Sequence, residues 1–73
     1  MTEPRYTAHA RRKVAERGIT PEMVSATIAA SGRRTVGRTA VEYDGIIDDR
    51  PIRVVVVKDS DPPLVITAHW IDR

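Results

Sequence analysis

The chain has 73 residues, no cysteine and a formal net charge of +2. A chain of this length buries only about 60% of its unfolded surface, which excludes a large enclosed substrate pocket, and the lack of cysteine excludes disulfides and thiolate metal sites. No apolar run approaches the roughly 20 residues of a membrane-spanning helix, and the first residues are polar, so we expect one cytoplasmic domain over residues 1–73 with no membrane partner.

The first predicted element is a short basic helix. Thr7 can cap its start, and Gly18 can adopt the left-handed conformation that ends it. His9, Lys13 and Arg17 recur every four positions and therefore share one face of this helix. A second face is apolar and carries Tyr6, Ala10 and Val14. The apolar face can pack on a sheet, while the basic face can meet an anion.

A second helix is predicted from Pro21 to about Ser31. Thr20 can cap it, and Pro21 suits its first position because the missing N–H would be unpaired there anyway. Its apolar face consists of Met23, Val24, Thr27, Ile28 and Ala30. Arg33 and Arg34 follow this helix, where cations interact favourably with the negative end of the helix dipole.

After residue 34 the apolar period changes from that of a helix to that of a strand. The pattern predicts a short strand near 35–37, a strand over 39–47, a β-branched strand over 52–57 and a last strand over 64–71. The third of these follows Pro51, which a strand tolerates at its start. The second half of the chain is therefore expected to form a meander.

The apolar positions of the last two strands predict how these strands pair. Those that match are Ile52, Val54 and Val56 on one strand and Leu64, Ile66 and Ala68 on the other. Helices should cover this face, so Arg53 and His69 should lie side by side on the open face. Either Tyr43 or Glu42 joins them, depending on a register that the sequence leaves open. The expected fold is α+β, with two N-terminal helices packed on one face of a three- to four-stranded antiparallel sheet.

The run from His9 to Thr20 reads His-Ala-x-x-basic-apolar-x-Glu-Arg-Gly-Ile-Thr. With the amphipathic helix, the Arg-Pro-Ile-Arg-Val-Val-Val strand and the final Val-Ile-Thr-Ala strand, it resembles a small bacterial family of domains of unknown function that is grouped with RelE-, ParE- and BrnT-like toxins. Lys13 stands where that family usually has arginine, and Val14 where it usually has methionine. The resemblance implies a RelE/BrnT-like fold and a ribonuclease toxin that an antitoxin protein would mask.

The available side chains favour one chemistry. The two histidines have no ligand spacing and no glycine-rich phosphate loop is present, so we expect no metal and no cofactor. Metal-independent RNA cleavage needs a group that moves the 2′-hydroxyl proton and cations that stabilise the phosphorane. The catalytic candidates are His69, Arg53 and His9. The candidates for binding RNA are Arg11, Arg12, Lys13, Arg17 and Tyr43.

Each candidate also has a structural interpretation. His9 can bond to free amides at its helix start, and His69 can be a half-exposed edge residue. Arg17 and Glu16 can form weak local pairs. Arg53 stands in a run of valines, where an unpaired buried guanidinium would be very costly. It therefore needs either a carboxylate partner, such as Glu42, or an anionic ligand.

The charge distribution also leaves two classes of function open. Residues 1–38 hold eight arginines or lysines and three acids, a net charge of +5, whereas residues 39–73 hold four and seven, a net charge of −3. A basic half can bind RNA, but a charged surface that serves only solubility is the more common reason for such a pattern. The alternative function is a non-catalytic module that binds a protein partner or nucleic acid, or forms a homodimer through a sheet edge.

Overall fold

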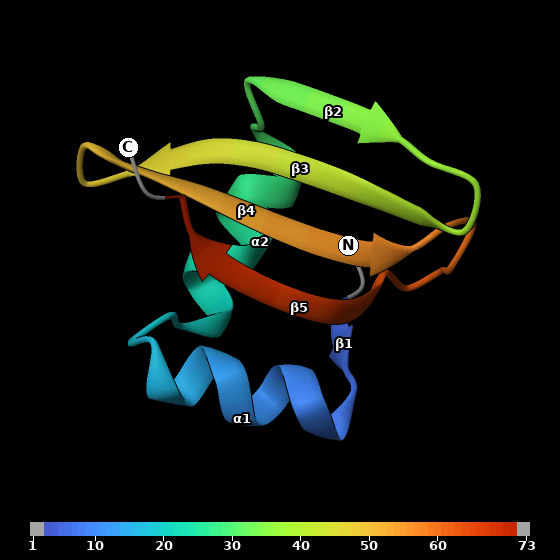
Figure 1. The fold of residues 1–73 in the computed structure, drawn as a ribbon, viewed down its shortest axis with the longest axis horizontal. Coiled ribbons are helices and arrows are strands. Elements are labelled where there is room, and N and C mark those ends of the chain that lie inside the picture. The colour runs from blue at the N-terminus through green and yellow to red at the C-terminus, as the bar shows by residue number, and fades with distance from the viewer. Residues whose placement is uncertain (1–2, 72–73) are drawn as a thin grey trace.

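Two helices precede most of the sheet in the computed structural model, which describes residues 3–71 (Figure 1). The elements in chain order are β1 (Arg5–Tyr6), α1 (Ala8–Glu16), α2 (Pro21–Ala29), β2 (Arg33–Val36), β3 (Ala40–Ile47), β4 (Arg50–Val57) and β5 (Leu64–Trp70). The strands form one sheet in the order β1-β5-β4-β3-β2. The predicted α+β class is therefore confirmed. Within residues 3–71, neither helix has the length and apolar content needed to span a bilayer.

The predicted helix ends are confirmed by their hydrogen bonds. Thr7 Oγ1 accepts a hydrogen bond from the Ala10 amide at 3.0 Å, and Thr20 Oγ1 accepts one from the Met23 amide at 3.2 Å. Gly18 has a φ of 67°, the left-handed conformation that costs glycine little. The second helix ends at Ala29, two residues before the predicted end.

The predicted sheet of three to four antiparallel strands is incomplete: β2 to β5 are antiparallel neighbours, but the sheet has five strands and is mixed. β1 adds a fifth strand that runs parallel to β5, with Arg5 opposite Leu64. The Arg5 amide donates to the Pro63 carbonyl at 2.8 Å, and the Thr7 amide donates to the Val65 carbonyl at 3.1 Å. Two residues are too few to show an alternating pattern, so the sequence gives no sign of this strand.

β2 also begins earlier than predicted and contains both arginines that follow α2. Arg33 lies opposite Asp44 in the ladder, and Arg34 lies opposite Tyr43. The guanidinium carbon of Arg34 lies 5.9 Å from the centroid of the Tyr43 ring. Strand pairing, and not the dipole of α2, therefore accounts for the position of these two arginines.

The central pairing follows the predicted register up to one irregularity. Arg53 lies opposite His69, and Val54 lies opposite Ala68. A register shift after Val55 then places Val56 opposite Val65, so Ile66 is the extra residue of a β-bulge. The prediction that Ile66 is buried in the core is therefore wrong, and Val65 takes that place.

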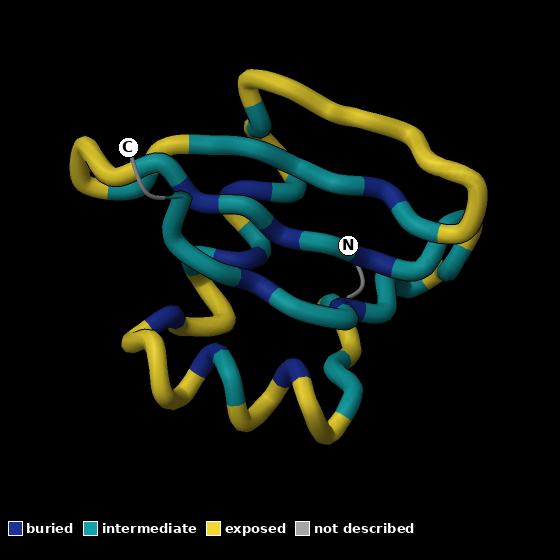
Figure 2. Tube along the Cα trace, viewed as in Figure 1, coloured by how far each residue is buried: buried dark blue, intermediate teal, exposed yellow. Residues whose placement is uncertain are grey.

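The core lies between the sheet and the two helices (Figure 2). The buried hydrophobic residues are Ala10, Val14, Ile19, Val24, Val41, Ile52, Val54, Val56, Val65 and Ala68. In Figure 1, α2 crosses behind β3 and β4, while α1 lies along the β5 side of the sheet. A Cβ atom on Gly45 would come within 3.3 Å of the Thr27 methyl group, so this glycine allows α2 to approach β3 closely. Within residues 3–71, no helix covers the opposite face of the sheet.

The bulge gives a matched test of the core. Ile52 is fully buried, whereas Ile66 is only partly buried. Ile52→Ala should lower the free energy of unfolding by ~2–5 kcal/mol. Ile66→Ala should lower it by less than half of the loss measured for Ile52→Ala. Denaturant titrations measure both changes, with Ile52→Val as the milder variant if Ile52→Ala does not fold. Equal losses at the two positions would contradict the bulge.

Candidate functional site

Arg53 and His69 form the centre of the open sheet face. They are direct partners in the β4–β5 ladder. Their neighbours Val54 and Ala68 are buried on the helix side, so the side chains of Arg53 and His69 point to the other face of the sheet. This is the juxtaposition that the sequence predicts, and the structure confirms it. The bulge lies beyond Val55 and therefore leaves this pair in register.

Two carboxylates of β3 hold the guanidinium of Arg53. Its Nε donates to Asp44 Oδ1 at 2.8 Å and its Nη2 donates to Asp44 Oδ2 at 3.0 Å, a bidentate pair. Glu42 Oε1 lies 3.4 Å from the same Nε. Glu42 is the predicted partner, whereas Asp44 is a partner that the sequence analysis missed. The register of β3 was the missing information, since only it places Asp44 directly opposite Arg53.

The pair fixes the charge of both groups. The hydrogen bonds from Arg53 lower the pKa of Asp44, desolvation opposes this, and the positive charges of Arg53, Arg33 and His69 lower it further. The hydrogen bond to Asp44 likewise raises the pKa of Arg53. Arg53 is thus a permanent cation whose charge Asp44 largely neutralises.

Tyr43 lies on the other face of the sheet. It is opposite Val54 in the β3–β4 ladder and packs against the core, while its neighbours Glu42 and Asp44 point to the open face. The sequence left open whether Tyr43 or Glu42 joins Arg53 and His69 on the open face, and the structure shows that it is Glu42. Tyr43 is not part of the group around His69.

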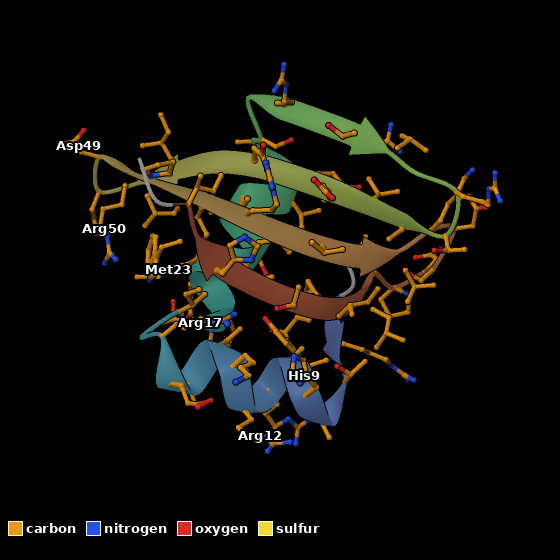
Figure 3. The ribbon with its side chains drawn as sticks, in the orientation of Figure 1. His9, Arg12, Arg17, Met23, Asp49 and Arg50 are labelled. Carbon is orange, nitrogen blue, oxygen red and sulfur yellow. The ribbon has the colours of Figure 1, made fainter. Side chains whose placement is uncertain are left out.

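The basic face of α1 reaches the same site through Arg17, the residue that follows the helix. Arg17 Nη1 donates to the Ala68 carbonyl at 2.8 Å and lies 3.5 Å from Thr67 Oγ1, so its guanidinium sits beside the residues that precede His69 (Figure 3). Trp70 Nε1 donates back to the Arg17 carbonyl at 2.9 Å. Of the local pairs predicted for Arg17 and Glu16, the structure has the one for Glu16, with Lys13 at 3.5 Å, whereas Arg17 turns to β5.

The other candidates on α1 lie farther away. His9 is exposed and two helical turns before Arg17, about 12 Å along the axis at 1.5 Å per residue. Lys13 lies between them on the same face. Arg11 and Arg12 are exposed on other sides of the helix, and Figure 3 shows Arg12 directed away from the sheet. The structure thus brings together His69, Arg53 and Arg17, and leaves His9, Arg11 and Arg12 outside this group.

A shallow hollow of about 530 Å³ adjoins the ion pair. Its lining consists of Ala30, Gly32, Arg33, Asp44, Gly45, Ile46, Pro51 and Ile71. Ile46 is 71% exposed, which is unusual for so large an apolar side chain. The open face therefore offers an apolar surface beside its charged centre. In the part of the chain that the structure describes, no three His, Cys, Asp or Glu residues gather as metal ligands.

Comparison with known proteins gives one match. A family model described as a domain of unknown function (DUF4258) matches residues 6–70. No curated protein and no solved structure matches the chain.

The Arg53–Asp44 pair predicts a defined response to acid. Because the pKa of Asp44 is lower in the folded than in the unfolded protein, the pair's stabilisation is complete above the ordinary value of 3.8 and is lost as the pH falls from there through the folded pKa. Arg53→Ala should raise the pKa of Asp44 towards 3.8. Carboxyl-detected NMR titration measures this shift, with Arg5→Ala as a control at a distant arginine. An unchanged Asp44 pKa in Arg53→Ala would contradict the pair.

Proposed function

Because the chain belongs to the DUF4258 family, whose description states no function, we propose a function from its own residues: it is a toxin-like, metal-independent ribonuclease. The single observation that supports this best is that His69 pairs with Arg53 across the β4–β5 ladder and follows Ala68, whose carbonyl accepts a hydrogen bond from Arg17. Phosphodiester cleavage requires a proton-transfer group and nearby cations.

In this proposal His69 moves the proton. A histidine side chain can act as a general base or a general acid, so it can take the proton from the 2′-hydroxyl or give one to the leaving oxygen. The attacking 2′-oxygen forms a bond to phosphorus, and the bond from phosphorus to the 5′-oxygen breaks. The products are a 2′,3′-cyclic phosphate and a 5′-hydroxyl, so no further reactant is needed.

The cations divide into two roles. Arg53 is held by Asp44, so it contributes a fixed and largely neutralised charge that keeps the open face ordered around His69. Arg17 and Lys13 lie on the α1 face that continues towards His69, and they are the groups proposed to contact phosphate oxygens. The RNA backbone would therefore run along α1 and onto the open face.

The toxin-like part of the proposal rests on the resemblance to RelE-, ParE- and BrnT-like toxins. That resemblance implies a bacterial, cytoplasmic protein whose antitoxin masks its activity. The arrangement of two N-terminal helices before a sheet supports it at the level of architecture. The expected biological readout is growth arrest on induced expression.

One observation favours a second candidate, a nucleic-acid binding module without catalysis. Arg53 is engaged by two carboxylates, so it is not free to stabilise a phosphorane. In that case the basic face of α1 would bind RNA, and His69 would be a contact residue. The two candidates differ in cleavage but share the binding surface.

The two histidines provide the test of catalysis. His69→Ala should reduce RNA cleavage by ~10²- to 10⁴-fold, the usual loss for a proton-transfer group, whereas His9→Ala should reduce it by less than about tenfold. Cleavage of a short single-stranded RNA is measured with a chelator present, after each variant is checked for folding. Equal activity of the His69→Ala variant and the wild type would remove the proposed site. RNA binding by an inactive wild-type protein would establish the second candidate.

The salt dependence of binding tests which side of α1 meets RNA. Loss of one phosphate contact to a single strand should reduce the slope of log K against log salt by ~0.7. Lys13→Ala should show this change, and Arg12→Ala, which removes the same charge from the side away from the sheet, should show little of it. A larger change for Arg12→Ala would place the RNA on the other side of the helix.

A further inference from the structure

β2 is an edge strand with all four residues exposed. Its neighbour on one side is β3, and in the order of the sheet no described strand lies on its other side. Val36 at its end is 50% exposed. An exposed edge presents a row of backbone donors and acceptors that can pair with another strand.

The hydrogen bond that directly follows β2 shows which of its backbone groups face outward. The Gly37 amide donates to the Ala40 carbonyl at 2.8 Å, which makes this a hydrogen-bonded pair of the antiparallel ladder. In an antiparallel ladder, hydrogen-bonded pairs alternate with pairs that are not hydrogen-bonded. Arg33 and Thr35 therefore direct their backbone N–H and C=O groups towards β3. Arg34 and Val36 therefore direct their N–H and C=O groups to the free edge.

The side chains at this edge are basic and apolar. Arg33, Arg34 and Arg38 are exposed along it. A hollow of about 180 Å³ lies below the edge, next to Val36 and Tyr43, with Lys58 and Asp59 on its far wall. An added strand would place alternate side chains over this hollow, because successive residues of a strand point to opposite faces.

We infer that β2 receives an extended acidic segment of a protein partner, which adds to the sheet as a further strand. Pairing at Arg34 and Val36 would supply backbone hydrogen bonds, the apolar side chains of the segment would cover Val36, and its carboxylates, which point to the opposite face, would meet Arg33. This surface lies at the opposite edge of the sheet from β5 and α1, so the inference does not depend on the ribonuclease proposal.

The charges argue against two other occupants. A second copy paired edge to edge through β2 would place arginines opposite arginines, and like charges in such positions are destabilising. RNA could contact the guanidinium groups, but phosphates would leave the alternating carbonyls of Arg34 and Val36 unpaired. An acidic strand satisfies both the charges and the backbone groups.

The test uses two peptides and three variants of the full chain. The probe is a short peptide of alternating glutamate and valine, and its control carries lysine in place of glutamate. Val36→Pro removes an outward N–H without removing a bond to β3, and Arg33→Glu reverses the charge on the face that the glutamates would occupy. Arg5→Glu makes the same charge change on β1 at the far edge of the sheet. Fluorescence anisotropy gives the affinity, and hydrogen exchange reports the Arg34 and Val36 amides.

We expect the glutamate peptide to bind and to slow exchange at the Arg34 and Val36 amides in the unmodified chain. Val36→Pro and Arg33→Glu should each weaken it by at least about tenfold, and Arg5→Glu by much less. The exchange measurement serves as the test if Val36→Pro does not fold. Equal binding of the lysine peptide, or no peptide binding at all, would overturn the inference. So would self-association that Val36→Pro abolishes, or RNA binding that Arg33→Glu abolishes.

Discussion

The bidentate pair between Arg53 and Asp44 is the constraint on which the arrangement of the sheet depends. A guanidinium in the middle of a valine-rich central strand cannot be buried without a partner, so it must lie on the face that no helix covers. Its carboxylate partner on β3 then fixes the parity of that strand. Once Asp44 and Glu42 face outward, Val41 and Gly45 must face α2, and the absence of a side chain on Gly45 lets Thr27 pack close to the strand.

The same pair shapes what the open face can do chemically. Asp44 neutralises much of the Arg53 charge, which leaves His69 beside a fixed and well-ordered partner, not beside a mobile cation. Arg17 supplies a second guanidinium from α1, and it also ties the end of that helix to β5 through Ala68 and Trp70. Under the proposed function, RNA binding and folding would therefore depend on some of the same contacts, and variants of Arg17 would affect both.

The sequence predicts those features that local chemistry determines. The caps at Thr7 and Thr20 and the pairing of Arg53 with His69 follow from residue type and period, and the structure confirms them. Three features could not be predicted for physical reasons. The β-bulge in β5 buries Val65 in place of Ile66, and nothing in the residue types announces it. The strand β1 has only two residues, which are too few to show an alternating pattern. Asp44 was missed because the sequence pattern of β3 allows either set of alternate side chains to face the helices. The available signal was that Arg53 needs a carboxylate partner, and it pointed to Glu42, which stands two residues before Asp44 on β3.

The central claim is that RNA binds the open face next to His69. Chemical-shift mapping with a short, uncleavable single-stranded RNA carrying 2′-deoxy substitutions tests it most directly. The account predicts that the largest perturbations fall on Thr67 and His69 of β5, on Arg53 of β4 and on Lys13 and Arg17 of α1. Perturbations confined to β2, or to the side of α1 that carries Arg12, would contradict it. So would the absence of any perturbation at an RNA concentration high enough to saturate other small basic RNA-binding domains.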